Sequence, residues 1–244
     1  MIQDSDGADQ IIGLYQRHAH AWASDRGTAP AEGDWLRQFR ALLPEQASVL
    51  DVGCGSGDPI ARFLTETGCA VTGVDSAPAM IGLCQAKFPG HTWQVGDMRS
   101  LDLNAAFDGL VAWDSFFHLC PADQKLMFPL FRKHASPRAA LIFTSGASHG
   151  EAIGSYRGET LYHASLNPEE YRALLAENGF AVGPTAPKTQ VAEVARFGWR
   201  RLGLCEWLSL ARSHILLILD SIGIRKQNCR DASRPGGAAE TYRG

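Results

Sequence analysis

The chain lacks the features that would place it in a membrane, outside the cell or on nucleic acid. Its apolar run at residues 215–219 has five residues, far fewer than the roughly 20 that a membrane-spanning helix needs. The basic and apolar pattern of a secretory signal is missing from the start of the chain, so we expect a cytoplasmic protein. A net charge of −3 offers no overall attraction to nucleic acids or anionic membranes.

Paired cysteines are also missing. The six cysteines are scattered without any C-x-x-C spacing, which favours reduced thiols and argues against a zinc site or a disulfide framework. No His, Cys and acid cluster has the spacing of metal ligands, so we expect no metal site. With 45% hydrophobic and 20% charged residues, the 244 residues suit a globular α/β domain with a sizeable core.

Two familiar phosphate-binding motifs are incomplete at the most informative turn of the chain. The apolar run Val49–Val52 leads into a turn with glycine at 53, 55 and 57. A phosphate loop would need a lysine here, and a dinucleotide fingerprint would need glycine at position 58, which is Asp58. What remains is a buried strand followed by a turn whose glycines let a ligand approach the backbone. An ordinary glycine-rich turn is the alternative.

Further apolar runs predict a mostly parallel sheet. They lie at residues 70–74, 91–95, 107–113 and 138–145, with helical segments between them, which favours a doubly wound α/β fold. Ligands in such folds bind beyond the carboxyl ends of the strands. Asp75 ends the second strand, where a doubly wound fold places the carboxylate that accepts from ribose hydroxyls. Its alternative role is to cap the helix that follows.

The pattern D-x-G-x-G-x-G from Asp51 to Gly57, with the strand order that follows it, resembles the class I S-adenosylmethionine-dependent methyltransferases. The resemblance covers about residues 10–183 and implies a Rossmann-like fold, S-adenosyl-L-methionine as cofactor and a small-molecule methyl acceptor. Shorter runs resemble a bacterial methyltransferase group whose substrate is not generally established; they are residues 113–119, 143–146, 149–154 and 161–166. The cofactor contacts that we expect are Tyr15, Arg26, Asp51, Gly53, Gly55, Gly57, Asp75, Ser76, Met80, Asp97, Met98 and Trp113.

The resemblance to this family implies specific roles for several of these residues. Asp97 would accept from the adenine amine, and Met98 would pack on the adenine ring or simply fill the core. A leading amphipathic helix over residues 8–25 would cover the pocket. Arg26, which directly follows this helix, would meet the methionine carboxylate of the cofactor. Tyr15 would face the cofactor or only bury the helix.

Two histidines are candidates for a general base. Methyl transfer from a sulfonium is an in-line displacement, in which the enzyme chiefly orients the reactants. A base helps when the acceptor must lose a proton, and histidine titrates near neutral pH. His118 and His163 are therefore the catalytic candidates, and each is alternatively a structural histidine. Aromatic residues after the fourth strand, Trp113, Phe116 and Phe117, favour an apolar or aromatic acceptor or belong to the core.

We divide the chain into three parts. Residues 1–45 form an amino-terminal helical cap, with a second helix over 34–43, and residues 46–183 form the cofactor-binding core. The long connection at 146–166 is expected to be a lid loop over the acceptor site. Asn167-Pro168 begins a further helix, and residues 180–182 begin a sixth strand.

The tail, residues 184–244, departs from the family pattern. The closing strand of the type T-V-W-L-A is not found, so the last strand is expected to be missing or replaced, and residues 191–224 suggest a helix. From Lys188 onward there are ten basic and five acidic residues, which leaves −8 on the rest, and the last 18 residues read as disordered. The tail is either a genuine extension or the product of a shifted reading frame, which the gene's nucleotide sequence distinguishes.

The leading function is therefore methyl transfer to a small molecule. Nucleic acid is disfavoured because the body is acidic and the fourth strand is not followed by an Asn-Pro-aromatic motif. A non-catalytic or disabled S-adenosylmethionine-binding protein is the alternative from another class. A nucleotide-dependent oxidoreductase is a third, disfavoured by the missing glycine at 58. The acceptor, the methylated atom and the oligomeric state are not determined by the sequence.

Overall fold

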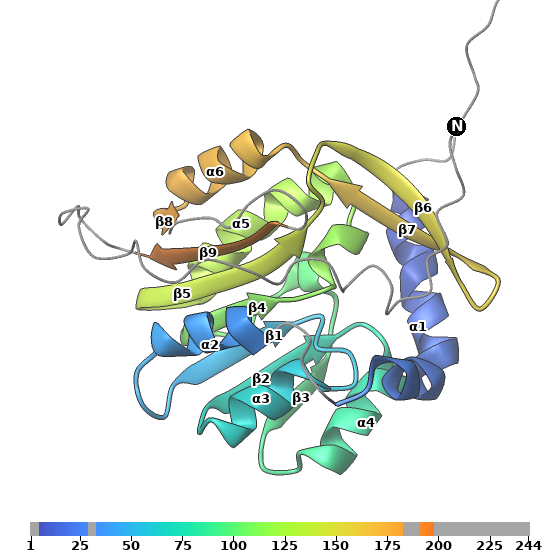
Figure 1. Cartoon of the computed structure of the whole chain (residues 1–244), viewed down its shortest axis with the longest axis horizontal. Helices are drawn as coiled ribbons and strands as arrows, with labels where there is room; N and C mark the ends of the chain where they lie inside the picture. The colour runs from blue at the N-terminus through green and yellow to red at the C-terminus, as the bar shows by residue number, and fades with distance from the viewer. Residues whose placement is uncertain (1–4, 29–32, 183–190, 198–244) are drawn as a thin grey trace, which may run out of the picture.

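A computed structural model describes residues 5–28, 33–182 and 191–197 (Figure 1). Helices α1 (Ser5–Arg26) and α2 (Gly33–Ala41) come first, and strands and helices then alternate. The alternating elements are β1 (Ser48–Val52), α3 (Ile60–Glu66), β2 (Ala70–Asp75), α4 (Pro78–Lys87), β3 (Thr92–Val95), β4 (Phe107–Ala112), α5 (Pro121–His134) and β5 (Ala135–Ser145). They are followed by β6 (Gly150–Tyr156), β7 (Glu159–Ser165), α6 (Pro168–Glu177), β8 (Phe180–Val182) and β9 (Val191–Phe197).

The central sheet has the strand order β3-β2-β1-β4-β5-β9-β8. Its first five strands are parallel, and β9 runs antiparallel to both β5 and β8. This confirms the predicted doubly wound, mostly parallel sheet. The order reverses between β1 and β4, which is the topological switch point where such folds bind ligands.

Strand β9 lies between β5 and β8, on the side of the sheet where the sequence predicts that the last strand is missing or replaced. Residues 191–197 pair with β5 from Ala140 opposite Arg196 to Ser145 opposite Val191. The helix predicted over 191–224 is therefore wrong for 191–197. The edge of β5 presents unpaired backbone groups, which a further strand satisfies and a helix does not. The rest of that prediction, residues 198–224, and the predicted disorder of the last 18 residues lie outside the described residues, and the shifted-frame hypothesis is not tested.

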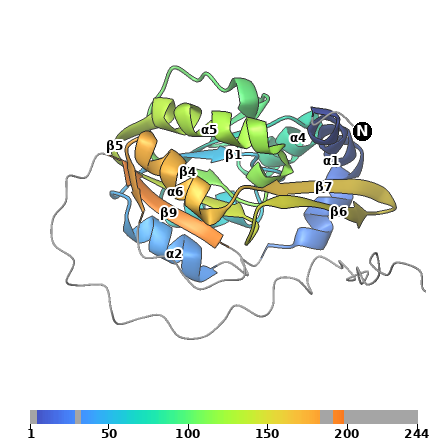
Figure 2. The same ribbon diagram turned by 90° about the horizontal axis from the view of Figure 1, so that it is seen from above.

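Helices cover both faces of the sheet, which explains why its strands are apolar on both sides. Helices α5 and α2 lie on opposite faces (Figure 2). On the face of α5, an aromatic cluster is fully buried; it comprises Phe116, Phe128, Phe131, Phe143 and Tyr171. On the other face, Leu36 and Phe39 of α2 pack with Val49 and Ile142. Helix α2 is thus packed on the core of the sheet. Of these two first helices, α1 lies beside strands β6 and β7 (Figure 1).

The connection at 146–166, expected to be a loop, is a β-hairpin. Strands β6 and β7 form a separate antiparallel sheet, with Gly150 opposite Ser165 and Tyr156 opposite Glu159. Arg157 and Gly158 both have positive φ, +50° and +84°, as the central residues of the tightest hairpin turns require. The hairpin extends from the body of the sheet to α1 (Figure 1).

A buried polar network fixes the base of this hairpin. The Tyr171 hydroxyl donates to Gln124 Oε1 at 2.6 Å and accepts from the backbone N–H of Leu166 at 3.0 Å. Gln124 Nε2 donates to the carbonyl oxygens of Leu119 and Ala164, each at 2.9 Å. Because these groups are buried and satisfy one another, the network ties α5, α6 and β7 together.

We predict that Tyr171→Phe lowers the free energy of unfolding by about 1–3 kcal/mol, because it leaves the Gln124 oxygen and the Leu166 N–H buried without their partner. Urea denaturation measures the loss. The matched control is Tyr156→Phe, which removes an exposed hydrogen bond to Asp25 and should cost clearly less. Equal losses in the two variants would contradict the prediction.

Candidate functional site

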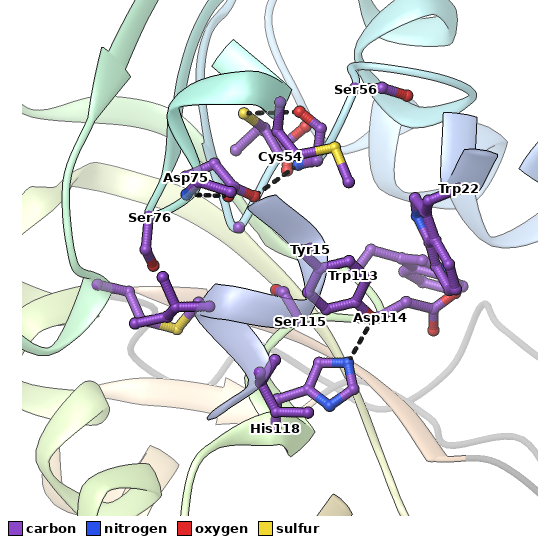
Figure 3. A pocket seen from close by; sticks show the side chains of 18 of the residues that line it. Tyr15, Trp22, Cys54, Ser56, Asp75, Ser76, Trp113, Asp114, Ser115 and His118 are labelled. Atoms are coloured by element: carbon purple, nitrogen blue, oxygen red, sulfur yellow. Dashed lines mark hydrogen bonds between the residues drawn. The ribbon is translucent and has the colours of Figure 1, made fainter. Parts of the chain in front are cut away.

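A cleft opens at the carboxyl ends of the parallel strands, and α1 contributes to its wall (Figure 3). About 930 Å³ of space not filled by atoms lies within it, part of it open to solvent. The expected site residues that line it are Tyr15, Arg26, Asp51, Gly53, Gly55, Asp75, Ser76, Met80, Asp97, Met98, Trp113 and His118. Gly57 and His163, which were also expected at the site, are not part of this lining.

The glycine turn is held against the end of β2. The N–H groups of Gly53 and Cys54 both donate to the carbonyl of Val74, at 2.7 and 3.1 Å. Gly53 has φ +73°, and a Cβ added there would lie 2.3 Å from the Cβ of Ser115. Gly55 has φ +53°, and an added Cβ would meet nothing within 4 Å. Gly53 is therefore required by packing, whereas Gly55 is required by its backbone conformation.

Gly57, which is not part of the cleft lining, has a packing role. Its φ is +79°, and an added Cβ would lie 2.8 Å from the ring of Phe88. The turn and the segment that follows α4 therefore approach each other closely at this point. A glycine pattern in sequence does not distinguish a residue that faces a ligand from one that faces a neighbouring helix.

Asp75 joins the turn to the start of α4. Its Oδ2 accepts from the N–H of Gly55 at 2.9 Å, and its Oδ1 accepts from the N–H of Ala77 at 2.8 Å. Burial raises the pKa of Asp75, although these two backbone hydrogen bonds lower it. The predicted ribose role and its alternative at the helix start are compatible, because each carboxylate oxygen keeps a second lone pair.

Two buried polar atoms in and before the turn have no protein partner. Asp51 is 2% exposed, and within the described chain its Oδ2 accepts no hydrogen bond. The Ser56 hydroxyl is in the same situation. Burial, and secondarily the charge of Asp75, raises the pKa of Asp51 to about 7. Unsatisfied buried groups are rare in native structures, so this pair points to a polar ligand in the cleft.

Asp97 is bound by an arginine that sequence reasoning did not identify. Its carboxylate accepts from the backbone N–H of Arg99 at 2.9 Å and from Arg99 Nη2 at 2.6 Å. Partial burial alone would raise the pKa of Asp97, but the hydrogen bonds and charge of Arg99 hold it below its usual value. The i, i+2 spacing on a short turn carries no recognisable pairing signal.

Arg26 and Asp114 meet in the cleft. Arg26, in the last turn of α1, places Nη2 3.2 Å from Oδ2 of Asp114. Asp114 follows β4 with φ +50°, a conformation unusual for a residue other than glycine and often found at functional sites. Its N–H donates to Thr144 Oγ1 at 2.8 Å, which helps to hold this conformation.

His118 is linked to two other elements. Its Nε2 lies 2.9 Å from the Tyr15 hydroxyl on α1, and its Nδ1 lies 2.7 Å from the backbone carbonyl of Tyr162 on β7. Burial, and secondarily His163, lowers the pKa of His118 to about 3. His163 itself is outside the cleft lining, with its ring centroid 4.9 Å from that of His118 and 5.1 Å from that of Phe117. These placements do not support His163 as a base at this cleft.

The aromatic residues after β4 separate into two groups. Trp113 lines the cleft and is 7% exposed, whereas Phe116 is fully buried in the core cluster and Phe117 packs on His163. A further cleft aromatic, Trp22 of α1, lies edge-on to Tyr15 and to Tyr156 of the hairpin, with centroids 5.1 and 5.2 Å apart. The aromatic wall of the cleft therefore comes largely from α1.

The part of the chain that the structure describes has neither a membrane-spanning helix nor a metal-binding cluster. Within 5–28, 33–182 and 191–197, no helix has the length and apolarity needed to cross a membrane. Over the same ranges, no group of three or more His, Cys, Asp and Glu side chains is arranged to hold a metal ion.

Comparisons with known proteins agree with this architecture. Residues 49–138 match a family model described as a methyltransferase domain. A segment of 107 residues is 30% identical to dTDP-4-amino-2,3,4,6-tetradeoxy-D-glucose N,N-dimethyltransferase of Saccharopolyspora spinosa, covering 44% of this chain and 40% of that protein. An O-methyltransferase of Pyrenophora dematioidea is 26% identical over 160 residues, 60% of this chain and 59% of its own length. The chain thus spans well under two thirds of these relatives.

Among solved structures, 1,6-didemethyltoxoflavin-N1-methyltransferase of Burkholderia thailandensis superposes with a TM-score of 0.64 at 19% identity, covering 81% of this chain and 92% of that one. At this identity the likeness shows the fold. Residues 49–138 are thus similar to a methyltransferase domain, and the described chain shares the fold of these structures. The resemblance of the glycine turn and strand order to this family is thereby confirmed.

The raised pKa of Asp51 predicts that the stability of the protein depends on pH. Because the folded protein holds this proton more tightly than an unfolded chain with the ordinary value of 3.8, Asp51 favours folding below about pH 4. That contribution is lost as the pH rises through about 7. We predict that Asp51→Asn removes it, so that the ligand-free variant gains up to about 4 kcal/mol relative to wild type between pH 4 and pH 8.

Chemical denaturation at several pH values between these limits measures the difference. Asp102→Asn is the control, because Asp102 is an exposed carboxylate paired with Lys133 outside the cleft lining. It should not reproduce the pattern. An Asp51→Asn variant whose stability followed the wild-type pH curve would contradict the assignment.

Proposed function

We propose that this protein is an S-adenosylmethionine-dependent methyltransferase that acts on a small molecule by in-line methyl transfer. The observation that carries the proposal is the glycine turn at the switch point of the sheet, where Asp51 Oδ2 and Ser56 Oγ are buried without hydrogen-bond partners among the described residues. The family match over residues 49–138 begins at this turn and supports the same assignment.

The cleft residues fit the chemical groups of the cofactor. Asp75 would accept from the ribose hydroxyls, and Asp97 with Met98 would meet the adenine. Asp51, whose free oxygen faces no protein donor, suits a donor such as the cofactor's amino group. Arg26, which also pairs with Asp114, would bind the carboxylate of the cofactor. When bound, S-adenosylmethionine supplies a methyl group on a positively charged sulfur.

The chain's own contribution is to orient the reactants and to exclude water. Helix α1 and the hairpin contact each other beside the cleft, where Tyr156 and Arg157 both donate to Asp25. Glu159 accepts from Arg17 and contacts His18. These hydrogen bonds hold the hairpin against α1, in the segment where the sequence predicts a lid loop. Orienting the reactants in a closed cleft lowers the barrier of a displacement by several kcal/mol.

The alternatives have less support. The hypothesis of a non-catalytic or disabled protein includes a product that lacks the last strand, and β9 occupies that position in the sheet. Among the relatives, one is named for an amino sugar and others as O-methyltransferases, so both nitrogen and oxygen acceptors occur in proteins similar to this one. The acceptors that the names of two similar proteins specify, an amino sugar and 1,6-didemethyltoxoflavin, are small molecules.

We predict that the purified full chain binds S-adenosylmethionine and S-adenosylhomocysteine with micromolar affinity, and that Asp75→Ala weakens binding at least about tenfold. The variant removes both the expected ribose contact and the acceptor that fixes the Gly55 N–H, and lost charge-assisted hydrogen bonds are each worth about 1.5–3 kcal/mol. Calorimetric titration measures both ligands.

Asp102→Ala is the control, since it removes an aspartate outside the cleft lining and should leave affinity unchanged. Circular dichroism must show that Asp75→Ala is folded. A folded wild-type chain that binds neither ligand would refute the proposed function.

A further inference from the structure

Three separate elements meet in one chain of hydrogen bonds at the cleft. Tyr15 comes from α1, His118 from the segment Phe116–His118 that follows β4, and the Tyr162 carbonyl from β7 of the hairpin. The first link, between Tyr15 and His118, is drawn as a dashed line in Figure 3. Tyr15 and His118 both line the cleft, so this chain belongs to its wall.

The direction of both hydrogen bonds follows from the chemistry of the end groups. A backbone carbonyl can only accept, so Nδ1 of His118 must carry a proton and donate to Tyr162. A neutral imidazole has one N–H, which leaves Nε2 as an acceptor. The Tyr15 hydroxyl must therefore donate to Nε2. Its proton is committed to His118, and the phenol oxygen has only lone pairs left to offer other groups.

The protonation states of both residues are locked. Burial lowers the pKa of His118 to about 3, and His163 beside it acts in the same direction. Burial, and then the charge of Asp114, raises the pKa of the Tyr15 hydroxyl. His118 therefore stays neutral near pH 7 and Tyr15 stays a phenol. Passing a proton from an acceptor through Tyr15 to His118 would create a buried imidazolium, which this environment strongly disfavours.

The other carboxylates of the cleft offer no better base for an acceptor. Asp97 is held by Arg99, Asp114 by Arg26, and Asp58 by Arg62 and Lys87. Asp75 accepts hydrogen bonds from two backbone N–H groups. Asp51 lies at the glycine turn, where the proposed function assigns it to the cofactor. An acceptor that must lose its proton before attack, such as an alcohol, is thus poorly served.

We propose that the Tyr15 oxygen accepts a hydrogen bond from an N–H of the methyl acceptor, that His118 is a positioning residue that fixes this oxygen as an acceptor, and that the acceptor is a weakly basic primary or secondary amine. This inference rests on the proposed function and specifies its substrate class. An amine nitrogen that is neutral near pH 7 carries both an N–H for Tyr15 and a lone pair for attack. It needs no base before the displacement.

The displacement balances without a general base. The nitrogen lone pair forms the new N–C bond as the S–C bond breaks, and the electron pair of that bond passes to the sulfur, which becomes a neutral thioether. The positive charge moves to the nitrogen, and the resulting ammonium loses its N–H proton to water. Aromatic amines and amino sugars are the amines whose low basicity suits this scheme.

Histidine-ring ¹⁵N spectra of the full chain test the locked geometry without any acceptor. His118, assigned among the eight histidines by its loss in His118→Gln, should carry its proton on Nδ1 and should not titrate between about pH 5 and pH 8. Tyr15→Phe should shift its Nε2 signal, because the hydrogen bond to that nitrogen is removed. Titration near neutral pH, or a proton on Nε2, would overturn the proposal.

The substrate class is tested with matched pairs of acceptors and radiolabelled S-adenosylmethionine: glucosamine against glucose, and aniline against phenol. We expect transfer to an amine and not to its hydroxyl partner, with a loss of about 10²-fold in kcat in Tyr15→Phe. His118→Leu should lose as much, whereas His118→Gln, whose amide can still accept and donate, should retain part of the activity.

Transfer to a hydroxyl partner at a comparable rate, or to no amine of the panel, would overturn the amine assignment. Calorimetric binding of S-adenosylmethionine, measured on the same samples, separates this failure from that of the proposed function. A chain that binds the cofactor but methylates alcohols fails only the inference, and one that binds no cofactor fails both.

Discussion

The cleft depends on the hydrogen bonds that fasten the glycine turn to the end of β2. The carbonyl of Val74 and the carboxylate of Asp75 together accept the N–H groups of Gly53, Cys54 and Gly55. Because parallel β1 and β2 end at the same edge of the sheet, these groups meet without any long side chain to bridge them. The turn is thereby opened toward the cleft, and Asp75 also fixes the start of α4.

This arrangement leaves uncompensated polar groups beneath the turn. The Asp51 carboxylate is buried at the end of β1 beside the charge of Asp75, and one of its oxygens has no donor among the described residues. Such a group disfavours the ligand-free fold near neutral pH and favours a ligand that brings a donor or a positive charge. The free-energy cost of burying the Asp51 carboxylate and the expected affinity for a cationic cofactor thus have one physical origin.

The cover of the cleft is built by elements that are distant in sequence. Helix α1 contacts the hairpin through Asp25 and Glu159, and His118 joins both to the end of β4. The base of the hairpin is in turn fixed by Tyr171 and its buried network. Because a neutral imidazole transmits a defined donor and acceptor direction, the position of β7 determines which way the Tyr15 hydroxyl points. The position of the hairpin over the cleft and the direction of the Tyr15 hydroxyl are therefore coupled.

The sequence by itself determined the parallel sheet, the glycine turn and the acids at or just beyond the ends of β1, β2 and β3. These depend on local patterns: apolar runs, glycines at fixed spacing and a carboxylate near the end of each run. It did not determine which face a residue takes. Gly57 faces Phe88 and not the cleft, and Phe116 faces the core. Nor did it determine that residues 150–165 pair as a hairpin or that β9 completes the sheet, since both rest on pairing partners elsewhere in the chain. The state of His118 was decided by tertiary structure alone: a free histidine titrates near neutral pH, and only burial between Tyr15 and the Tyr162 carbonyl makes it a fixed, neutral acceptor.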